Sequence, residues 1–304
     1  MRCGRCITIA VVAVLMVVNH ASYGEDGTGV VASGAKLQKL GGLYHNTTGR
    51  SKTEGPVADH KGNVYFTDPY GAVIYRWNPK DGIGIFTDDS GGANGLFLDA
   101  AGTIVACQAY RRRVVAFGPD GAETVLADSY EGKRLNEPND LYIDSRGGIY
   151  FSDPFWHVHK EPSEIDCEGV YYITPGTKEV IRVIDNLQKP NGIHGSPTGS
   201  VLYVIDTPQD KTFMYDVKPD GTLEHSREFA PHGLDGLTVD SDGNVYITAL
   251  EKKVYVYTSG GELIYTIEAP EQPSNVCFGG DDNTTLFITA GKSLYSICLK
   301  VKGL

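Results

Sequence analysis

Six polar residues recur at similar distances along the chain, and every one of their side chains carries an oxygen. They are separated by 40, 45, 52, 44 and 39 residues, and they are Glu54, Asn94, Asn139, Asn191, Asp235 and Ser274. If these side chains met at one point, two carboxylates and several amide oxygens would need a cation between them. Hard divalent ions such as Ca²⁺ or Mg²⁺ prefer oxygen ligands of this kind. The absence of His and Cys from the set disfavours a dedicated zinc site, although Zn²⁺ or Mn²⁺ could bind as guests.

Each of these residues also has a simpler interpretation as a turn residue. Asn, Asp and Ser side chains often bond to nearby backbone groups where a strand begins. This explains the Asn and Asp positions taken singly, but it does not explain why Glu54 is in phase with them. We therefore favour a metal site for the set, with Asn94 and Ser274 as possible further members of the ring.

The six residues each begin a repeated phrase. A short alternating strand, an Asp-Gly-type turn and a second strand follow, as in NDLYIDSRGGIYFSD from Asn139 and DGLTVDSDGNVYITA from Asp235. A third strand and usually a fourth, outer strand complete each copy. A period of 40–50 residues with four strands per unit is typical of β-propellers. The sequence thus predicts an all-β fold, a six-bladed β-propeller with four-stranded blades, over residues 34–304.

The innermost strand of each propeller blade runs along the central channel. The first residues of the six repeats should therefore converge at one mouth of that channel. The last repeat ends one strand short, so we predict that Lys36–Leu40 supplies its outer strand and closes the ring. Residues 25–33 would then be a loose N-terminal lead.

Residues 1–24 have the features of a signal peptide. Arg2 and Arg5 precede the apolar stretch Ile7–Val18, and small residues at Ser22 and Gly24 suit a cut before Glu25. An uncleaved anchor is the alternative. We expect an exported protein, periplasmic or secreted, with no membrane contact after cleavage.

The net charge bears on binding partners, and the cysteine content bears on disulfide bonds. The 304 residues carry a formal net charge of −11, which disfavours binding to nucleic acid. Four cysteines follow the signal (Cys107, Cys167, Cys277 and Cys298) without a CxxC motif, so we expect mostly buried free thiols. The sequence indicates no oligomeric state.

Several stretches together resemble one known family. They include TEGPVADHKGNVYFTD (53–68), YEGKRLNEPNDLYIDSRGGIYFSDP (130–154), QKPNGI (188–193) and GLDGLTVDSDGNVYIT (233–248). The ordered set resembles the gluconolactonase branch of the senescence-marker-protein/gluconolactonase (regucalcin-like) family. This resemblance implies a six-bladed propeller with a divalent cation at its axis.

The resemblance also implies roles for single residues. Glu54, Asn191 and Asp235 would bind the metal, and Asn139 would join them or touch substrate. Asp235 would be the acid–base or nucleophilic group. Arg134, shortly before the EPND motif, is the matching candidate for a substrate contact.

The sequence departs from the family pattern where a substrate pocket would be lined. In the family the third repeat continues as a Tyr-Gly-bearing loop after its SDP-like triplet, but here the chain reads Pro154-Phe155-Trp156-His157. We take Phe155 and Trp156 as possible pocket residues, and His157 and His159 as parts of a loop over the pocket rather than zinc ligands.

Two further positions carry predictions. His232 lies three residues before Asp235 and could reach the mouth of the site. The run Arg111-Arg112-Arg113 is expected to be a solvated turn.

The resulting hypothesis is metal-dependent hydrolysis of a small sugar lactone. Two alternatives remain open at this point. The same site could act on other esters, such as phosphotriesters, or the chain could be a non-catalytic propeller whose cation is structural, since fold alone does not prove chemistry.

Overall fold

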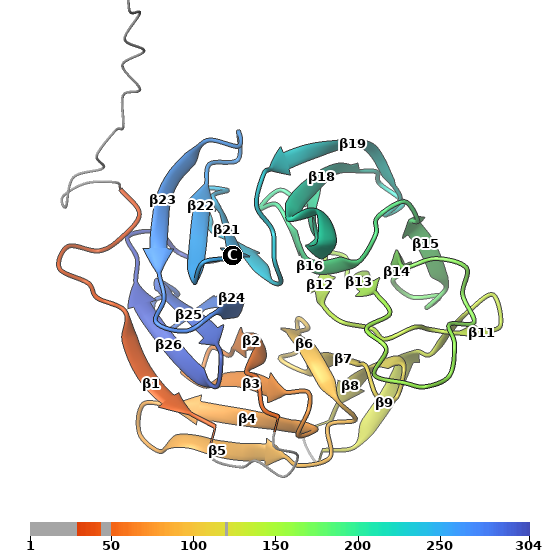
Figure 1. Ribbon diagram of the computed structural model, residues 1–304, viewed down its shortest axis with the longest axis horizontal. Helices are drawn as coiled ribbons and strands as arrows, with labels where there is room; N and C mark the ends of the chain where they lie inside the picture. The colour runs from red at the N-terminus through yellow and green to blue at the C-terminus, as the bar shows by residue number, and fades with distance from the viewer. Residues whose placement is uncertain (1–28, 44–49, 119–120) are drawn as a thin grey trace, which may run out of the picture.

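Six four-stranded antiparallel sheets surround a central axis in the computed structural model (Figure 1). The structure describes residues 29–43, 50–118 and 121–304. Within these ranges the only helical element is the 3₁₀ turn η1 (Thr207–Gln209), and a two-stranded hairpin, β10–β11 (Ser129–Tyr130 and Lys133–Arg134), precedes the third blade. The predicted six-bladed propeller is confirmed.

Each blade has its strands in chain order from the axis outward. The first three blades are β2–β5 (Glu54–Ala58, Val64–Asp68, Val73–Asn78, Gly82–Thr87), β6–β9 (Ala93–Leu98, Ile104–Gln108, Arg113–Phe117, Glu123–Ala127) and β12–β15 (Leu141–Ile143, Ile149–Asp153, Gly169–Ile173, Val180–Ile184). The fourth and fifth are β16–β19 (Pro190–Gly195, Val201–Asp206, Lys211–Val217, Leu223–Ala230) and β20–β23 (Leu237–Val239, Val245–Ala249, Lys253–Tyr257, Leu263–Glu268). The sixth is β24–β26 (Pro273–Gly279, Thr285–Ala290, Ser293–Cys298) with β1 (Gln38–Gly42) on its outside.

Burial falls from the inner to the outer strands of a blade. Every residue of the second strands β7, β13 and β21 is buried, because neighbouring blades cover both of their faces. The outer strands β5 and β9 are half-buried or exposed along most of their length. The near-continuous apolar character of the second strands is therefore what binds one blade to the next.

Apolar side chains fill each of the six gaps between successive blades. One of these clusters joins Val64 and Phe66 of the first blade to Phe287 and Leu294 of the sixth. The other five join the remaining neighbouring pairs in the same way. The core is thus a ring of interfaces, and the axis itself is left to polar side chains.

The ring is closed by the N-terminal strand, as predicted, two residues later than expected. β1 pairs antiparallel with β26, with Gln38 opposite Ser296 and Gly42 opposite Ser293. Figure 1 shows this red strand lying against the blue strand from the end of the chain. The sixth blade therefore contains both ends of the propeller sequence.

The described part of the N-terminal lead is not loose. Val30 is buried among apolar residues of the last two blades, and Val31 forms a β-bridge with Leu299. The backbone N–H of Lys300 donates to the carbonyl of Val30 at 2.8 Å. Residues 29–33 thus also hold the two ends of the propeller sequence together, because Val30 and Val31 pack against residues of the sixth blade. The rest of the predicted lead and the predicted signal peptide lie outside the described residues.

In the described ranges, no helix has the length and apolar character needed to cross a membrane. All four cysteines that follow the signal are free. Cys107 is buried as expected, but Cys298 is exposed because it ends the last strand of the sixth blade.

The prediction of a solvated arginine turn is wrong for its central residue. Arg112 is only 2% exposed. Its Nε donates to the carbonyls of Leu135 and Asn136, at 2.6 and 2.9 Å. The buried guanidinium therefore ties the second blade to the segment that enters the third. Sequence reasoning could not foresee this, since the partner carbonyls belong to another blade.

Candidate functional site

The inner strands meet around the axis through backbone hydrogen bonds between blades. The N–H of Gly192 donates to the carbonyl of Asp235 at 2.8 Å, and that of Gly236 donates to the carbonyl of Ser274 at 2.7 Å. A Cβ on Gly192 would lie 2.4 Å from the Asp235 oxygen, so only glycine permits this approach. The residues that begin the repeats are therefore brought to one end of the channel.

Aspartates at the ends of the second strands fix the segments that lead into the inner strands. They are Asp68, Asp153 and Asp206. Asp153 accepts the N–H of Asn136 at 2.7 Å, and Asp206 accepts that of Lys189 at 2.9 Å. Burial raises the pKa of Asp153 to about 8. These contacts set the positions from which Asn139 and Asn191 enter the axis.

The central cluster combines side chains of the first, fourth and fifth blades. Asn191 Nδ2 donates to Asp235 Oδ1 at 2.9 Å. The other Asp235 oxygen accepts from Lys52 Nζ at 2.6 Å. The same ammonium group forms an ion pair with Glu54 Oε1. Predicted residues Glu54, Asn191 and Asp235 are thus together, and Lys52 lies among them.

The electrostatics of this cluster favour bound positive charge. The Glu54 side chain is 3% exposed and that of Asp235 is 13% exposed. Burial, followed by the nearby Asp235 carboxylate, raises the pKa of Glu54 to about 8, and Lys52 opposes this rise. Burial alone would lower the pKa of Lys52, but the two carboxylates raise it above its ordinary value.

One buried acceptor in the cluster has no partner within the described residues. This atom is Oε2 of Glu54. A buried carboxylate oxygen without a hydrogen bond is costly, and a cation would satisfy it. The Asn139 backbone is fixed by its N–H bond to the carbonyl of Ser152 at 2.9 Å, and the residue is 5% exposed. The oxygen-bearing side chains of Glu54, Asn191 and Asp235 therefore have the chemistry that a hard divalent ion prefers, and Asn139 leads into the neighbouring inner strand β12.

Amide oxygens would be essential ligands for such an ion. Across the described ranges, no three His, Cys, Asp or Glu side chains gather in a way that could hold a metal. Two carboxylates with neutral amide oxygens suit Ca²⁺ or Mg²⁺ better than Zn²⁺.

A second polar layer closes the channel directly beneath the cluster. Asn275 Nδ2, from the sixth blade, donates to Asp140 Oδ2 of the opposite third blade at 3.2 Å. Gly95 and Gly236 leave the space for this pair, since a Cβ on either would lie 2.3 Å from Asp140 Oδ1 or 2.1 Å from Asn275 Cγ. Burial raises the pKa of Asp140 to about 7. This pair links the third and sixth blades across the axis.

Comparison with known proteins places this architecture in a family. A model of the SMP-30/Gluconolactonase/LRE-like region matches residues 52–292. The chain belongs to this family. The match begins at Lys52, two residues before the first residue of the predicted ring.

Individual relatives agree with that assignment. The chain is 30% identical over 286 residues to a gluconolactonase of Zymomonas mobilis, covering 83% of this chain and 79% of that protein. It matches the structure of a gluconolactonase from Xanthomonas campestris at 30% identity, with a TM-score of 0.81 and coverage of 88% and 91% of the two chains. A calcium-binding regucalcin of Agrobacterium tumefaciens shares the fold at 16% identity, with a TM-score of 0.73 and coverage of 91% and 95%.

The β13–β14 loop follows Asp153, at the end of the third blade where Asn139 leads into its inner strand. This β13–β14 loop is held by Glu137, which is fully buried. The Glu137 carboxylate accepts the backbone N–H groups of Trp156, Val158 and His159. Three N–H donors to one buried carboxylate make a strong anchor. The loop is therefore anchored by Glu137 of the EPND motif, the same motif that carries Asn139.

The predicted pocket residues lie on this loop. Trp156 is 37% exposed, and the Lys189 ammonium lies 4.6 Å from the centre of its ring. Lys189 Nζ also donates to the carbonyl of Phe155 at 2.9 Å. A ring nitrogen of His159 lies 3.1 Å from the carbonyl of Ala109, so this histidine holds the loop against the second blade.

Ser274 and Asn94, the two further ring candidates, take part in hydrogen bonds between neighbouring blades. Ser274 is fully buried, and its hydroxyl lies 2.9 Å from Thr289 Oγ1 and also bonds the carbonyl of Thr53. The carbonyl of Asn94 accepts from Thr67 Oγ1 at 2.9 Å. The Ser274 hydroxyl is therefore occupied by contacts to Thr53 and Thr289 that are not those of a local turn, and the bond at Asn94 involves only its backbone.

His232 and Arg134 lie away from the central cluster. The His232 ring is 4.1 Å from the ring of Tyr255, its Nδ1 bonds the Tyr257 hydroxyl, and burial lowers its pKa. Arg134 is exposed on β11, whose partner strand β10 packs beside the outer strand β15. The structure thus does not bring these two side chains to Asp235.

Lys52 is the site residue that sequence reasoning missed. It lies outside the repeated phrase, which begins at Glu54. A signal was nevertheless present: the residue two places before the ring position is charged in three repeats, as Lys52, Glu137 and Lys189. In the structure Lys52 pairs with Glu54 and Asp235, Glu137 holds the β13–β14 loop, and Lys189 bonds to Phe155 of that loop.

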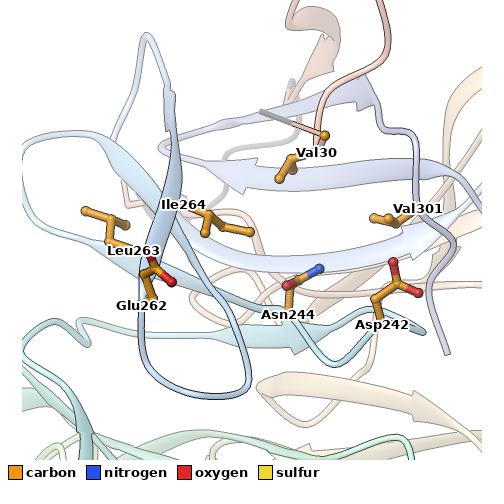
Figure 2. A pocket seen from close by; sticks show the side chains of 8 residues that line it. Val30, Asp242, Asn244, Glu262, Leu263, Ile264 and Val301 are labelled. Carbon is orange, nitrogen blue, oxygen red and sulfur yellow. The ribbon is translucent and has the colours of Figure 1, made fainter. Parts of the chain in front are cut away.

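A separate pocket of about 410 Å³ lies on another part of the molecule (Figure 2). Val30 and Val301 approach it from the chain ends, and Asp242, Glu262 and Ile264 from the fifth blade. Its lining contains none of the predicted site residues and no histidine, cysteine or hydroxyl side chain. The axial cluster is therefore the better candidate for the family's chemistry.

Proposed function

We propose that this chain is a lactonase that opens a sugar lactone by metal-dependent hydrolysis at the propeller axis. The observation that carries the proposal is the buried pair Glu54 and Asp235, with Asn191 bonded to Asp235 and Glu54 Oε2 left without a partner among the described residues. The names of the relatives at 30% identity support the substrate class.

Each residue has a distinct part in this proposal. A divalent ion held by Glu54, Asn139, Asn191 and Asp235, with Ca²⁺ our first choice, would polarise the carbonyl and lower the pKa of water. Asp235 is held at one oxygen by Asn191 Nδ2 and presents the other to the mouth. This second oxygen would take the proton from the attacking water or attack the carbonyl directly.

The amide orientation supports the same arrangement. Because Asn191 donates through Nδ2, its Oδ1 is left as an acceptor for a ligand. Glu54 would mainly balance positive charge, since its buried carboxyl group already pairs with the Lys52 ammonium through one oxygen and has no partner at the other.

The mouth loop would define which lactone is accepted. Trp156 offers a partly exposed aromatic face, and Lys189 lies over it. Aromatic faces pack well on the C–H faces of sugar rings through apolar contact. We propose that this loop orients the lactone ring above Asp235.

The decisive experiment follows ring opening of glucono-1,5-lactone by acid release. We expect turnover that a chelator abolishes and that Ca²⁺, Mg²⁺, Mn²⁺ or Zn²⁺ restores to different degrees. Asp235→Asn should be inactive while its circular dichroism spectrum stays unchanged. Full activity of that variant would exclude the role of Asp235, and turnover that chelator leaves intact would exclude the metal.

We further propose that the protein is exported, on the pattern of residues 1–24. N-terminal sequencing of the protein recovered from outside the cytoplasm should begin at Glu25. Recovery of the intact N-terminus from the cytoplasm would contradict export.

A further inference from the structure

The side chain of Lys52 spans the two carboxylates that would hold the cation. Its ammonium lies 2.6 Å from Asp235 Oδ2 and is also paired with Glu54 Oε1. The Lys52 side chain is 38% exposed, whereas those of Glu54 and Asp235 are 3% and 13% exposed. The lysine therefore reaches a buried carboxylate pair from the solvent side of the mouth.

One ammonium group is an incomplete partner for this pair. The ammonium contacts one oxygen of each carboxyl group, and Glu54 Oε2 remains buried without a hydrogen bond. The lysine thus occupies the position between the carboxylates without satisfying all of their oxygens.

We propose that Lys52 is a tethered cation that competes with the divalent ion for Glu54 and Asp235. In the metal-free protein its ammonium holds the two carboxylates together. When the divalent ion binds, the ammonium moves outward to the mouth. This inference rests on the cation site of the proposed function.

The two cations cannot share the position. A unit charge and a divalent ion only a few ångströms apart repel strongly even at the effective dielectric of a protein surface. The lysine side chain is long and flexible, and its ammonium is readily hydrated, so leaving for solvent is feasible. While the Lys52 ammonium lies between the carboxylates, the divalent ion cannot bind there. The apparent affinity for the ion is therefore lowered by the fraction of molecules in which the lysine holds that position.

The chain contains a matched control in Lys189. It stands two residues before Asn191, as Lys52 stands two residues before Glu54. Its ammonium points to the carbonyl of Phe155 and the ring of Trp156 instead of the carboxylate pair. Removing Lys189 therefore removes a mouth lysine without removing the competitor.

Calorimetric titration of Ca²⁺ into the chelator-stripped full-length protein tests the proposal. We expect Lys52→Met to lower the Kd for Ca²⁺ by about tenfold or more, because the competing charge is gone. Lys52→Arg retains a tethered cation and should bind Ca²⁺ much as the wild type does. Lys189→Met should leave the Kd unchanged. A Kd for Lys52→Met equal to or weaker than that of the wild type would overturn the proposal.

Chemical labelling gives a readout that is independent of affinity. An amine-acetylating reagent followed by peptide mass spectrometry should modify Lys52 slowly without Ca²⁺ and several-fold faster at saturating Ca²⁺. The labelling rate of Lys189 should not respond. A Lys52 rate that Ca²⁺ does not change would contradict the outward movement.

The two proposals fail in different ways. If neither the wild type nor Lys52→Met binds a divalent ion, the cation site and the competitor are both excluded. If the wild type binds Ca²⁺ and Lys52→Met binds it no more tightly, only the competitor is excluded and the lactonase proposal stands.

Discussion

Among single residues, Glu54 and Asp235 differ in what surrounds their carboxylates. Asp235 has a partner at each oxygen, in Asn191 and Lys52, whereas one oxygen of Glu54 is buried and unpaired. This asymmetry favours Asp235 for proton transfer, with one oxygen held and the other reachable from the mouth. It favours Glu54 as the residue whose charge retains the ion.

The role of Glu54 leads to a prediction about affinity. Glu54→Gln should weaken Ca²⁺ binding by about tenfold or more, because a neutral amide removes one of two ligand charges. Calorimetric titration measures the change. Glu271→Gln is a suitable control, since Glu271 bonds Ser293 and Tyr295 within the sixth blade. Unchanged affinity in Glu54→Gln would remove Glu54 from the ligand set.

A buried histidine predicts how stability depends on pH. His194 packs against Tyr142, with ring centres 4.9 Å apart, and its Nδ1 lies 2.8 Å from the carbonyl of Gly195. Burial lowers its pKa to about 4 from an ordinary value of about 6.5. The unfolded chain therefore takes up this proton first as the pH falls. The free energy of unfolding should drop between pH 6.5 and 4, by about 3 kcal/mol at 1.36 kcal/mol per pKa unit.

His194→Gln isolates that contribution. Urea unfolding at pH 7 and pH 4.5 should show a smaller loss of stability in this variant than in the wild type. The variant retains an amide that can bond to the Gly195 carbonyl. An equal acid loss in both proteins would show that His194 is not responsible.

The sequence predicted where the ring residues lie better than what their side chains do. Repetition placed Glu54, Asn191 and Asp235 at one mouth, because equivalent positions of a propeller must converge. It could not distinguish these from Ser274, whose hydroxyl forms hydrogen bonds with the backbone carbonyl of Thr53 and the side chain of Thr289. It also missed Lys52, since its partners are set by the approach segment and not by the repeat.

At the scale of elements, the repeated phrases indicated the inner two strands of a blade. The phrase from Asn139 contains Leu141–Ile143 and Ile149–Asp153, and the phrase from Asp235 contains Leu237–Val239 and Val245–Ala249. The approach segments had no such pattern. Their form depends on carboxylates such as that of Asp206, which ends the second strand of its blade and accepts the backbone N–H groups of the approach segment.

The β13–β14 loop provides a prediction at this scale. Glu137→Gln replaces one of two accepting oxygens with an N–H donor that faces the loop amides of Trp156, Val158 and His159. The loop should loosen, which should raise KM for the lactone by about tenfold while kcat changes less, because a positioning contact is lost. Steady-state kinetics and limited proteolysis between residues 155 and 160 measure the two effects.

A control for this prediction lies in the same loop. Glu161 is exposed, and Glu161→Gln should leave both KM and proteolysis unchanged. Ca²⁺ affinity should be the same in all three proteins, because Asn139 keeps its backbone bond to Ser152. If Glu137→Gln shows wild-type KM and proteolysis, Glu137 does not hold the substrate loop.

At the scale of the whole molecule, the axial cluster depends on a closed ring. Glu54, Asn191 and Asp235 come from three blades, so their separation is set by how the blades pack around the circle. The last gap is filled by Val64 and Phe66 against Phe287 and Leu294. β1 covers the outer side of that junction by pairing with β26.

Removal of the closing segment should therefore affect both stability and the distant site. A variant lacking residues 29–42 loses the β1–β26 ladder and the burial of Val30, and leaves β26 as an exposed edge. We expect a loss of several kcal/mol, which is a fall in Tm of roughly 5–10 °C for a chain of this size. Ca²⁺ affinity should fall as well, since the first blade that carries Glu54 is no longer held against the sixth.

The double variant Gln38→Ala, Lys39→Ala keeps the backbone ladder and changes exposed side chains, so its Tm should stay close to that of the wild type. A truncated protein with wild-type Tm and Ca²⁺ affinity would show that the blades hold the axial geometry without the N-terminal strand.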